Sequence, residues 1–102
     1  MELVLYHRTT TSAAQQIVAE GFRDGEGYYM TANLHRGVWL SDRPLDANEG
    51  TLGETLLRVE MDCTEGDIAK WEWVEEGRGY REWLVPADIV NDLARVRIDP
   101  DD

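Results

Sequence analysis

Most of the patterned segments in this chain alternate apolar and polar residues, and this alternation constrains the fold more than any other feature. The segments that alternate, and so predict β-strands, are 2–7, 37–41, 55–61 and 80–85. Helical spacing of apolar residues is confined to 13–20 and, more briefly, 87–93. A strand, then a helix, then mostly strands is the order of an α+β domain. We therefore expect a mostly antiparallel sheet with one or two helices.

The first helix is bounded by residues with strong end preferences. Ser12 is expected to be its N-cap, with Gln15 three residues later completing a capping box. Gly21 follows the last helical position and suits a helix C-terminus, because glycine readily takes a positive φ. Phe22 is then expected to fold back onto the core.

The remaining segments are less regular. Further strands are expected at 28–30, at 68–74 with Trp71 and Trp73 on one face, and at the sheet edge over 95–98. The rest of 23–36, together with 46–53 and 75–79, is expected to form loops and turns.

Length and charge limit the classes of function. A chain of 102 residues makes one domain, which we place at 1–98, followed by a short acidic tail at 99–102. The formal charge of −11 repels phosphate, so general binding to nucleic acid or to anionic membranes is disfavoured. The basic residues are nine Arg and one Lys, which suits bidentate phosphate contacts or reflects only a compositional bias.

Cys63 is the only cysteine, so a disulfide within the chain is impossible and a reducing compartment is expected. Its neighbours Asp62 and Glu65 disfavour a thiolate, which predicts a structural residue.

Two His and one Cys at wide spacing match no common zinc pattern, so no metal is expected. The sequence shows neither a secretory segment nor an apolar run long enough for a membrane span. We therefore expect a cytoplasmic protein without membrane contact.

His7 and Glu82 are the strongest catalytic candidates. His7 ends the first predicted strand, where a neutral imidazole can bond a sugar hydroxyl or transfer a proton, although a packed histidine is the alternative. Glu82 shares a predicted strand face with Tyr80 and Leu84, and a carboxylate on an apolar face is costly unless it is used or paired. The alternative is an ion pair of Glu82 with Arg8 or Arg81. Trp39 alternates with Ser41 on another strand; it suits either the core or stacking against a flat ring.

Four segments together resemble the ADP-ribosyltransferase superfamily, in the histidine–tyrosine–glutamate class related to the poly-ADP-ribose polymerases. They are Leu5-Tyr6-His7-Arg8-Thr9 with the helix ending in Glu20-Gly21-Phe22, then Gly37-Val38-Trp39-Leu40-Ser41-Asp42, Thr55 to Met61, and Tyr80-Arg81-Glu82-Trp83-Leu84-Val85. Their order and spacing are similar to those of the family over roughly residues 3–88.

The resemblance implies a small split β-sheet that holds NAD in a bent form, without a metal and without a Rossmann motif. It implies that His7 orients a ribose hydroxyl, that the Arg8 backbone holds the nicotinamide amide and that Trp39 stacks on the nicotinamide ring. Glu82 would stabilise the cationic transition state as nicotinamide leaves, and Thr9, Ser41 and Tyr80 would complete the cofactor site. The implied function is NAD-dependent transfer of ADP-ribose to an unknown acceptor, or NAD hydrolysis.

The sequence departs from the family pattern at two site positions and in length. Arg8 stands where the family has glycine, and Trp39 stands where it has tyrosine. The short chain leaves little room for a substrate-recognition loop, which fits a compact toxin-like enzyme. Two alternatives stay open: a non-catalytic interaction module on the same fold, and an enzyme similar to the RNA 2′-phosphotransferases, against which the acidic charge argues.

Overall fold

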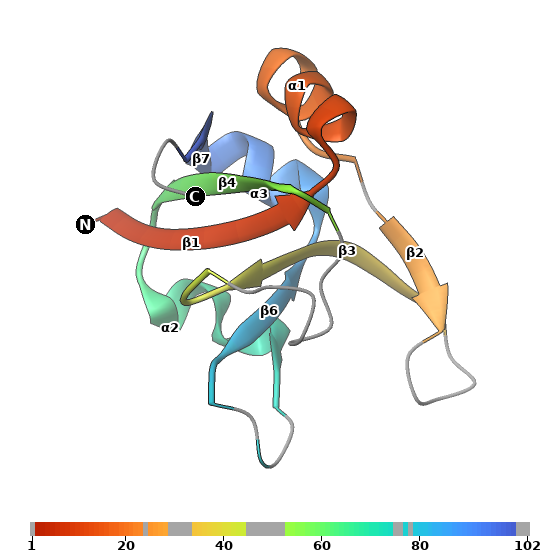
Figure 1. The fold of residues 1–102 in the computed structure, drawn as a ribbon. Helices are drawn as coiled ribbons and strands as arrows, with labels where there is room; N and C mark the ends of the chain where they lie inside the picture. The colour runs from red at the N-terminus through yellow and green to blue at the C-terminus, as the bar shows by residue number, and fades with distance from the viewer. Residues whose placement is uncertain are drawn as a thin grey trace.

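The computed structural model describes residues 2–23, 25–28, 34–44, 53–74, 77 and 79–99. In chain order (Figure 1) the elements are β1 (Glu2–Thr9), α1 (Thr11–Glu20), β2 (Gly25–Tyr28), β3 (Leu34–Ser41), β4 (Thr55–Asp62), α2 (Glu65–Ile68), the 3₁₀ turn η2 (Ala69–Trp71), β5 (Glu72–Trp73), β6 (Glu82–Val85), α3 (Ala87–Leu93) and β7 (Ala94–Ile98).

The strands form an antiparallel sheet. Six of them lie in the order β5-β6-β3-β1-β4-β7, and β2 pairs with β3 beside this path. Every strand pair in the described part of the chain is antiparallel. The expected α+β class with an antiparallel sheet is therefore confirmed, and β7 lies at the edge where a final strand was predicted.

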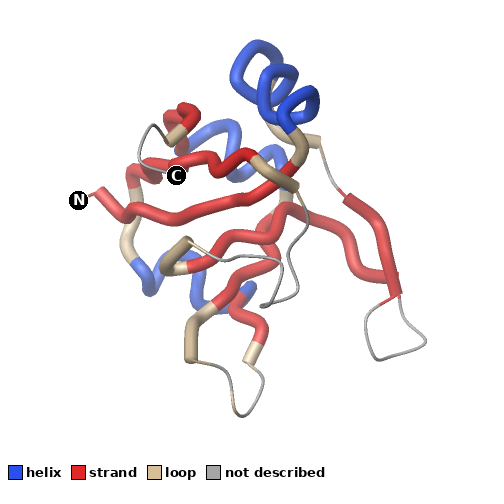
Figure 2. The backbone as a smooth tube through the Cα atoms, in the orientation of Figure 1, coloured by secondary structure: helices blue, strands red, loops and turns tan. Residues whose placement is uncertain are grey.

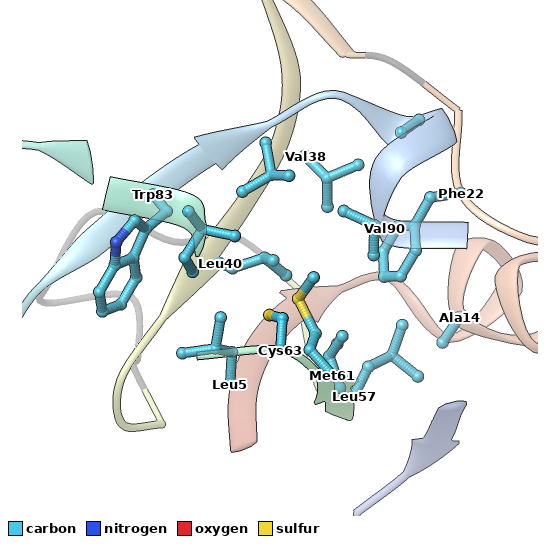
Figure 3. Packing of buried hydrophobic residues seen from close by; sticks show 14 residues of the cluster. Leu5, Ala14, Phe22, Val38, Leu40, Leu57, Met61, Cys63, Trp83 and Val90 are labelled. Carbon is cyan, nitrogen blue, oxygen red and sulfur yellow. The ribbon is translucent and has the colours of Figure 1, made fainter. Parts of the chain in front are cut away.

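One face of this sheet carries the hydrophobic core. Leu5 pairs with Val59 and Leu40 pairs with Trp83, and all four side chains are fully buried. Each of the three α-helices adds buried residues to this cluster: Ala14, Ile68, Ala87 and Val90. Figure 3 shows side chains from the sheet and the helices meeting in this layer. Each large side chain removed from water here stabilises the fold by about 1.5–3 kcal/mol.

Helix α1 begins earlier than its sequence pattern predicts. Its N-cap is Thr10 rather than Ser12, and the Thr10 hydroxyl accepts the backbone N–H of Ala13. Thr10 directly follows β1 and keeps an extended backbone, so it is the first residue able to cap the new helix. The predicted C-terminus is confirmed: Gly21 has φ +89° and donates its N–H to the Ile17 carbonyl, and Phe22 is buried.

The largest correction concerns the predicted strand at 68–74. Thr64 and Asp67 form a reciprocal capping box that starts α2, and η2 follows directly. Only Glu72–Trp73 pairs as strand β5, so the described residues hold three α-helices rather than one or two. Ile68, Ala69 and Trp71 belong to helical turns, because a strong N-terminal cap precedes them.

Other predicted boundaries shift by a few residues. β3 starts at Leu34, inside an expected loop, because it continues as a hairpin partner of β2. β6 starts at Glu82 rather than at Tyr80. The short strand expected at 28–30 coincides with β2 only at Tyr28, and residues 29 and 30 lie outside the described residues, as does most of the loop expected at 46–53. In the expected acidic tail, Asp99 donates its N–H to the Leu56 carbonyl, and residues 100–102 lie outside the described residues.

Candidate functional site

The sheet divides between β1 and β3. β1 pairs with β4 over eight positions and β3 pairs with β6 over four. Between β1 and β3 the described residues share one register pair, Tyr6 with Ser41. Past this pair β1 turns toward α1 while β3 continues toward its hairpin with β2 (Figure 2). The sheet is thus two halves joined at one position, and His7 is the first β1 residue past that join.

The His7 side chain bridges the two halves where backbone pairing stops. Its Nδ1 lies 2.7 Å from the backbone oxygen of Trp39, and its ring meets the Phe22 ring edge to face at 5.3 Å. A carbonyl oxygen only accepts hydrogen bonds, so Nδ1 carries the proton that it donates. Burial lowers the pKa of His7, and the Trp39 carbonyl opposes this only in part. The neutral ring at pH 7 therefore leaves Nε2 as an acceptor.

A cavity of about 240 Å³ lies beside this histidine. Its walls come from the end of β1, from α1 and the residues that follow it, and from β3: His7, Ala13, Gln16, Ile17, Gly21, Phe22, Arg23, Gly37, Val38 and Trp39. The Phe22 ring and the His7 imidazole, among largely aliphatic walls, suit a flat, weakly polar ring. Arg23 supplies the cation of this wall, and its side chain is 80% exposed.

Glu82 lies one strand beyond β3. It pairs in register with Ser41 on one side and with Trp73 on the other. Cross-strand partners point to the same face, so Tyr6, Ser41 and Glu82 form one row. His7 follows Tyr6 and so points to the opposite face, toward the core side. Glu82 is not among the residues that line the described cavity, so the structure does not bring it together with His7 there.

Trp39 is the residue that connects the two sides. Its carbonyl bonds His7, while its position two residues before Ser41 places its ring on the face of Glu82. The Trp39 ring packs edge to face against Trp73 at 5.5 Å, and Trp73 is the register partner of Glu82. The structure thus brings two of the candidate site residues, His7 and Trp39, into contact through the Trp39 backbone.

The other predicted site residues take supporting positions. The buried Ser41 hydroxyl contacts the backbone oxygens of Tyr6 at 3.3 Å and Arg43 at 2.7 Å, so its proton is used within the fold. Tyr80 lies under the guanidinium of Arg43, 5.5 Å from the ring centroid. Arg8 and Thr9 are half-buried in β1, paired with β4.

Arg81, beside Glu82, anchors the start of β6. Its guanidinium binds Glu72 through two contacts of 3.0 and 2.9 Å and Glu65 through one of 2.9 Å. Its N–H donates to the Asp42 carboxylate, and its carbonyl accepts the Asp42 N–H, both at 3.0 Å. The carboxylates of Glu72 and Glu65 raise the pKa of Arg81, so Arg81 remains a cation. The ion pairs that the structure gives for Arg81 are with Glu72 and Glu65; an ion pair of Glu82 with Arg8 or Arg81 stays the structural alternative for Glu82.

Three residues near this site are absent from the sequence-based set: Phe22 as a wall, Arg23 as the nearby cation, and Asn91 behind Phe22. The signal for the first two is their position directly after the helix-ending Gly21, which returns the chain to β1. For Asn91 the sequence holds no signal, since its contact with Phe22 spans 69 residues.

Other kinds of site find no support in the described residues. No group of three or more His, Cys, Asp or Glu there is arranged to hold a metal ion. Cys63 is buried, and burial, followed by Asp67 and Asp62, raises the pKa of its thiol. Among the described helices, none has both the length and the apolar character needed to cross a membrane.

Comparisons of this chain with models of protein families, with curated protein sequences and with solved structures found no match.

Proposed function

We propose that this domain binds NAD and breaks its nicotinamide–ribose bond, passing ADP-ribose to an acceptor or to water. The observation that carries the proposal is the His7–Trp39 contact at the split of the sheet, beside a cavity. It supplies a neutral imidazole with a fixed tautomer at a point where the backbone of the sheet is open.

The first part of the proposal concerns binding. With Nδ1 committed to the Trp39 carbonyl, Nε2 of His7 can accept a hydrogen bond from a ribose hydroxyl. Pockets that enclose a drug-sized ligand measure about 300–1,000 Å³. The 240 Å³ cavity therefore holds one part of a dinucleotide, and the remainder extends along the split. Arg23, whose exposed side chain lies 3.8 Å from the Glu20 carboxylate, is the cation beside the cavity that would offset the negative charge of the pyrophosphate.

The second part concerns the chemistry. As nicotinamide leaves, positive charge develops at the anomeric carbon, and a fixed carboxylate lowers the energy of that transition state. Glu82 is the candidate carboxylate because its register places its side chain on the same face of the sheet as the Trp39 ring. His7 and Glu82 lie on opposite faces, so one small ring cannot touch both. A dinucleotide that bends across Trp39 can touch both.

The experiment measures nicotinamide release from NAD by the purified protein. The wild type is expected to release nicotinamide, and Glu82→Gln is expected to be slower by at least about 100-fold while NAD still raises its melting temperature. Glu2→Gln, which removes the same charge at the exposed start of β1, is the matched control and is expected to match the wild type. Equal rates for Glu82→Gln and Glu2→Gln would falsify the assignment of Glu82.

A second candidate is a non-catalytic module that binds a nucleotide on the same scaffold. The observation that favours it is the separation of Glu82 from the cavity, because an intact binding pocket does not require the carboxylate. This candidate predicts a thermal shift with NAD and no nicotinamide release from any variant. If the protein neither releases nicotinamide nor shows a thermal shift with NAD, both candidates are excluded.

A further inference from the structure

The side chain of Asn91, on α3, is matched to the backbone of Phe22. Its Oδ1 accepts the Phe22 N–H at 2.8 Å, and its Nδ2 donates to the Phe22 carbonyl at 2.9 Å. Both polar atoms of one amide thus pair with both backbone groups of a single residue, as a strand partner would. Phe22 lies between α1 and β2, where the described residues give it no strand pairing, so Asn91 takes that place.

The residue before Phe22 leaves space for this contact. A Cβ placed on Gly21 would lie 2.9 Å from the Asn91 Oδ1, and the φ of +89° also disfavours any other residue there. Asn91 is held in turn by α3, whose neighbouring residue Val90 is fully buried in the core. The amide therefore extends from a helix packed on the core to a chain segment that contributes to the cavity wall.

Phe22 contacts both Asn91 and His7, and so connects α3 to the cavity beside His7. Phe22 is 5% exposed and lines the cavity together with His7, and its ring meets His7 edge to face. We propose that Asn91 is a positioning residue for the His7 cavity: by holding the Phe22 backbone, it keeps the Phe22 ring against the imidazole and fixes the cavity wall. The consequence for NAD rests on the proposed function above, whereas the consequence for His7 does not.

The test compares Asn91→Ala with Asp92→Ala, which changes an exposed neighbour on the same helix. The first readout is the titration of His7 followed by NMR of its ring. Loss of the Phe22 anchor lets water reach the imidazole, so the pKa of His7 is expected to rise toward its ordinary value of 6.5 in Asn91→Ala and to stay at the wild-type value in Asp92→Ala.

The second readout is kinetic. Asn91→Ala is expected to raise the KM for NAD about tenfold with a smaller change in kcat, because a displaced wall weakens binding before it affects the leaving step. If Asn91→Ala does not fold, Asn91→Ser and the exchange rate of the Phe22 amide proton provide the comparison. An unchanged His7 titration in a folded Asn91 variant overturns the proposal. If the wild type does not bind NAD, the proposed function fails, and the titration still decides the role of Asn91.

Discussion

The Nδ1 of His7 and the carbonyl oxygen of Trp39, 2.7 Å apart, join the two halves of the sheet where their backbones stop pairing. In an unbroken ladder the Trp39 carbonyl would accept a backbone N–H from β1. Here a side chain supplies that hydrogen bond. The same contact that closes the sheet therefore selects the tautomer of the histidine.

The pH dependence of stability follows from this contact. Burial lowers the pKa of His7 in the folded state, so the unfolded chain binds a proton more readily. The stability that neutral His7 contributes is complete above the unfolded pKa of about 6.5 and falls as the pH drops from there toward the folded pKa. His7→Asn places an amide donor near the Nδ1 position and does not titrate. Urea unfolding between about pH 7.5 and pH 5.5 is expected to show a steeper loss of stability for the wild type than for His7→Asn. Parallel curves contradict the prediction.

The sequence predicts the strands better than their ends. The segment 55–61 alternates from Leu57 onward and forms β4, because a strand that buries one face places apolar residues at every second position. The start of β6 could not be read in this way. The Arg81 N–H bonds the Asp42 side chain before strand pairing begins, and that contact spans 39 residues.

Whether the candidate site residues meet depends on geometry that the sequence pattern does not specify. His7 and Trp39 were both expected in one site and are in contact through the Trp39 carbonyl. The face of Glu82 depends on the register of three strands, and a shift of one residue reverses the direction of every side chain. The sequence pattern does not specify the register of β1 against β3, because they share a single pair. For that reason the separation of His7 from Glu82 was not foreseen.

Trp39 is expected to contribute to NAD binding through its ring and to the fold through its backbone. Trp39→Ala leaves the carbonyl that binds His7 and removes the ring that packs on Trp73. Because an aromatic pair contributes about 0.5–1.5 kcal/mol, NAD affinity is expected to fall about two- to tenfold, and Trp39→Phe to retain most of it. Isothermal titration calorimetry measures both affinities. An affinity for Trp39→Ala equal to that of the wild type contradicts ring stacking.

Gly53 is expected to tolerate substitution less than Gly77, although both have positive φ values of +114° and +82°. A Cβ on Gly53 would overlap the Thr9 backbone at the end of β1, while a Cβ on Gly77 meets nothing within 4 Å. Gly77→Ala is therefore expected to cost only the backbone strain of about 1–2 kcal/mol. Gly53→Ala also displaces the strand that carries His7. Its free energy of unfolding, measured by chemical denaturation, is therefore expected to fall clearly more than that of Gly77→Ala. Equal losses would show that the end of β1 moves freely.

Arg81 is expected to stabilise the start of β6 through ion pairs that weaken with salt. Arg81→Gln removes all three contacts with Glu72 and Glu65, whereas Arg81→Lys keeps the charge but loses the two-point contact with Glu72. The destabilisation of Arg81→Gln is expected to shrink between about 0.1 M and 1 M NaCl, since the screening length falls from about 10 Å to about 3 Å. The matched control is Arg97→Gln, which removes an exposed arginine whose pair with Glu60 spans 3.7 Å; it is expected to change stability less.

Because Glu82 follows Arg81 directly, nicotinamide release is also expected to slow in Arg81→Gln and to recover in part in Arg81→Lys. If Arg81→Gln and Arg97→Gln show the same stability at low salt and the same release rate, Arg81 has no special role in holding β6.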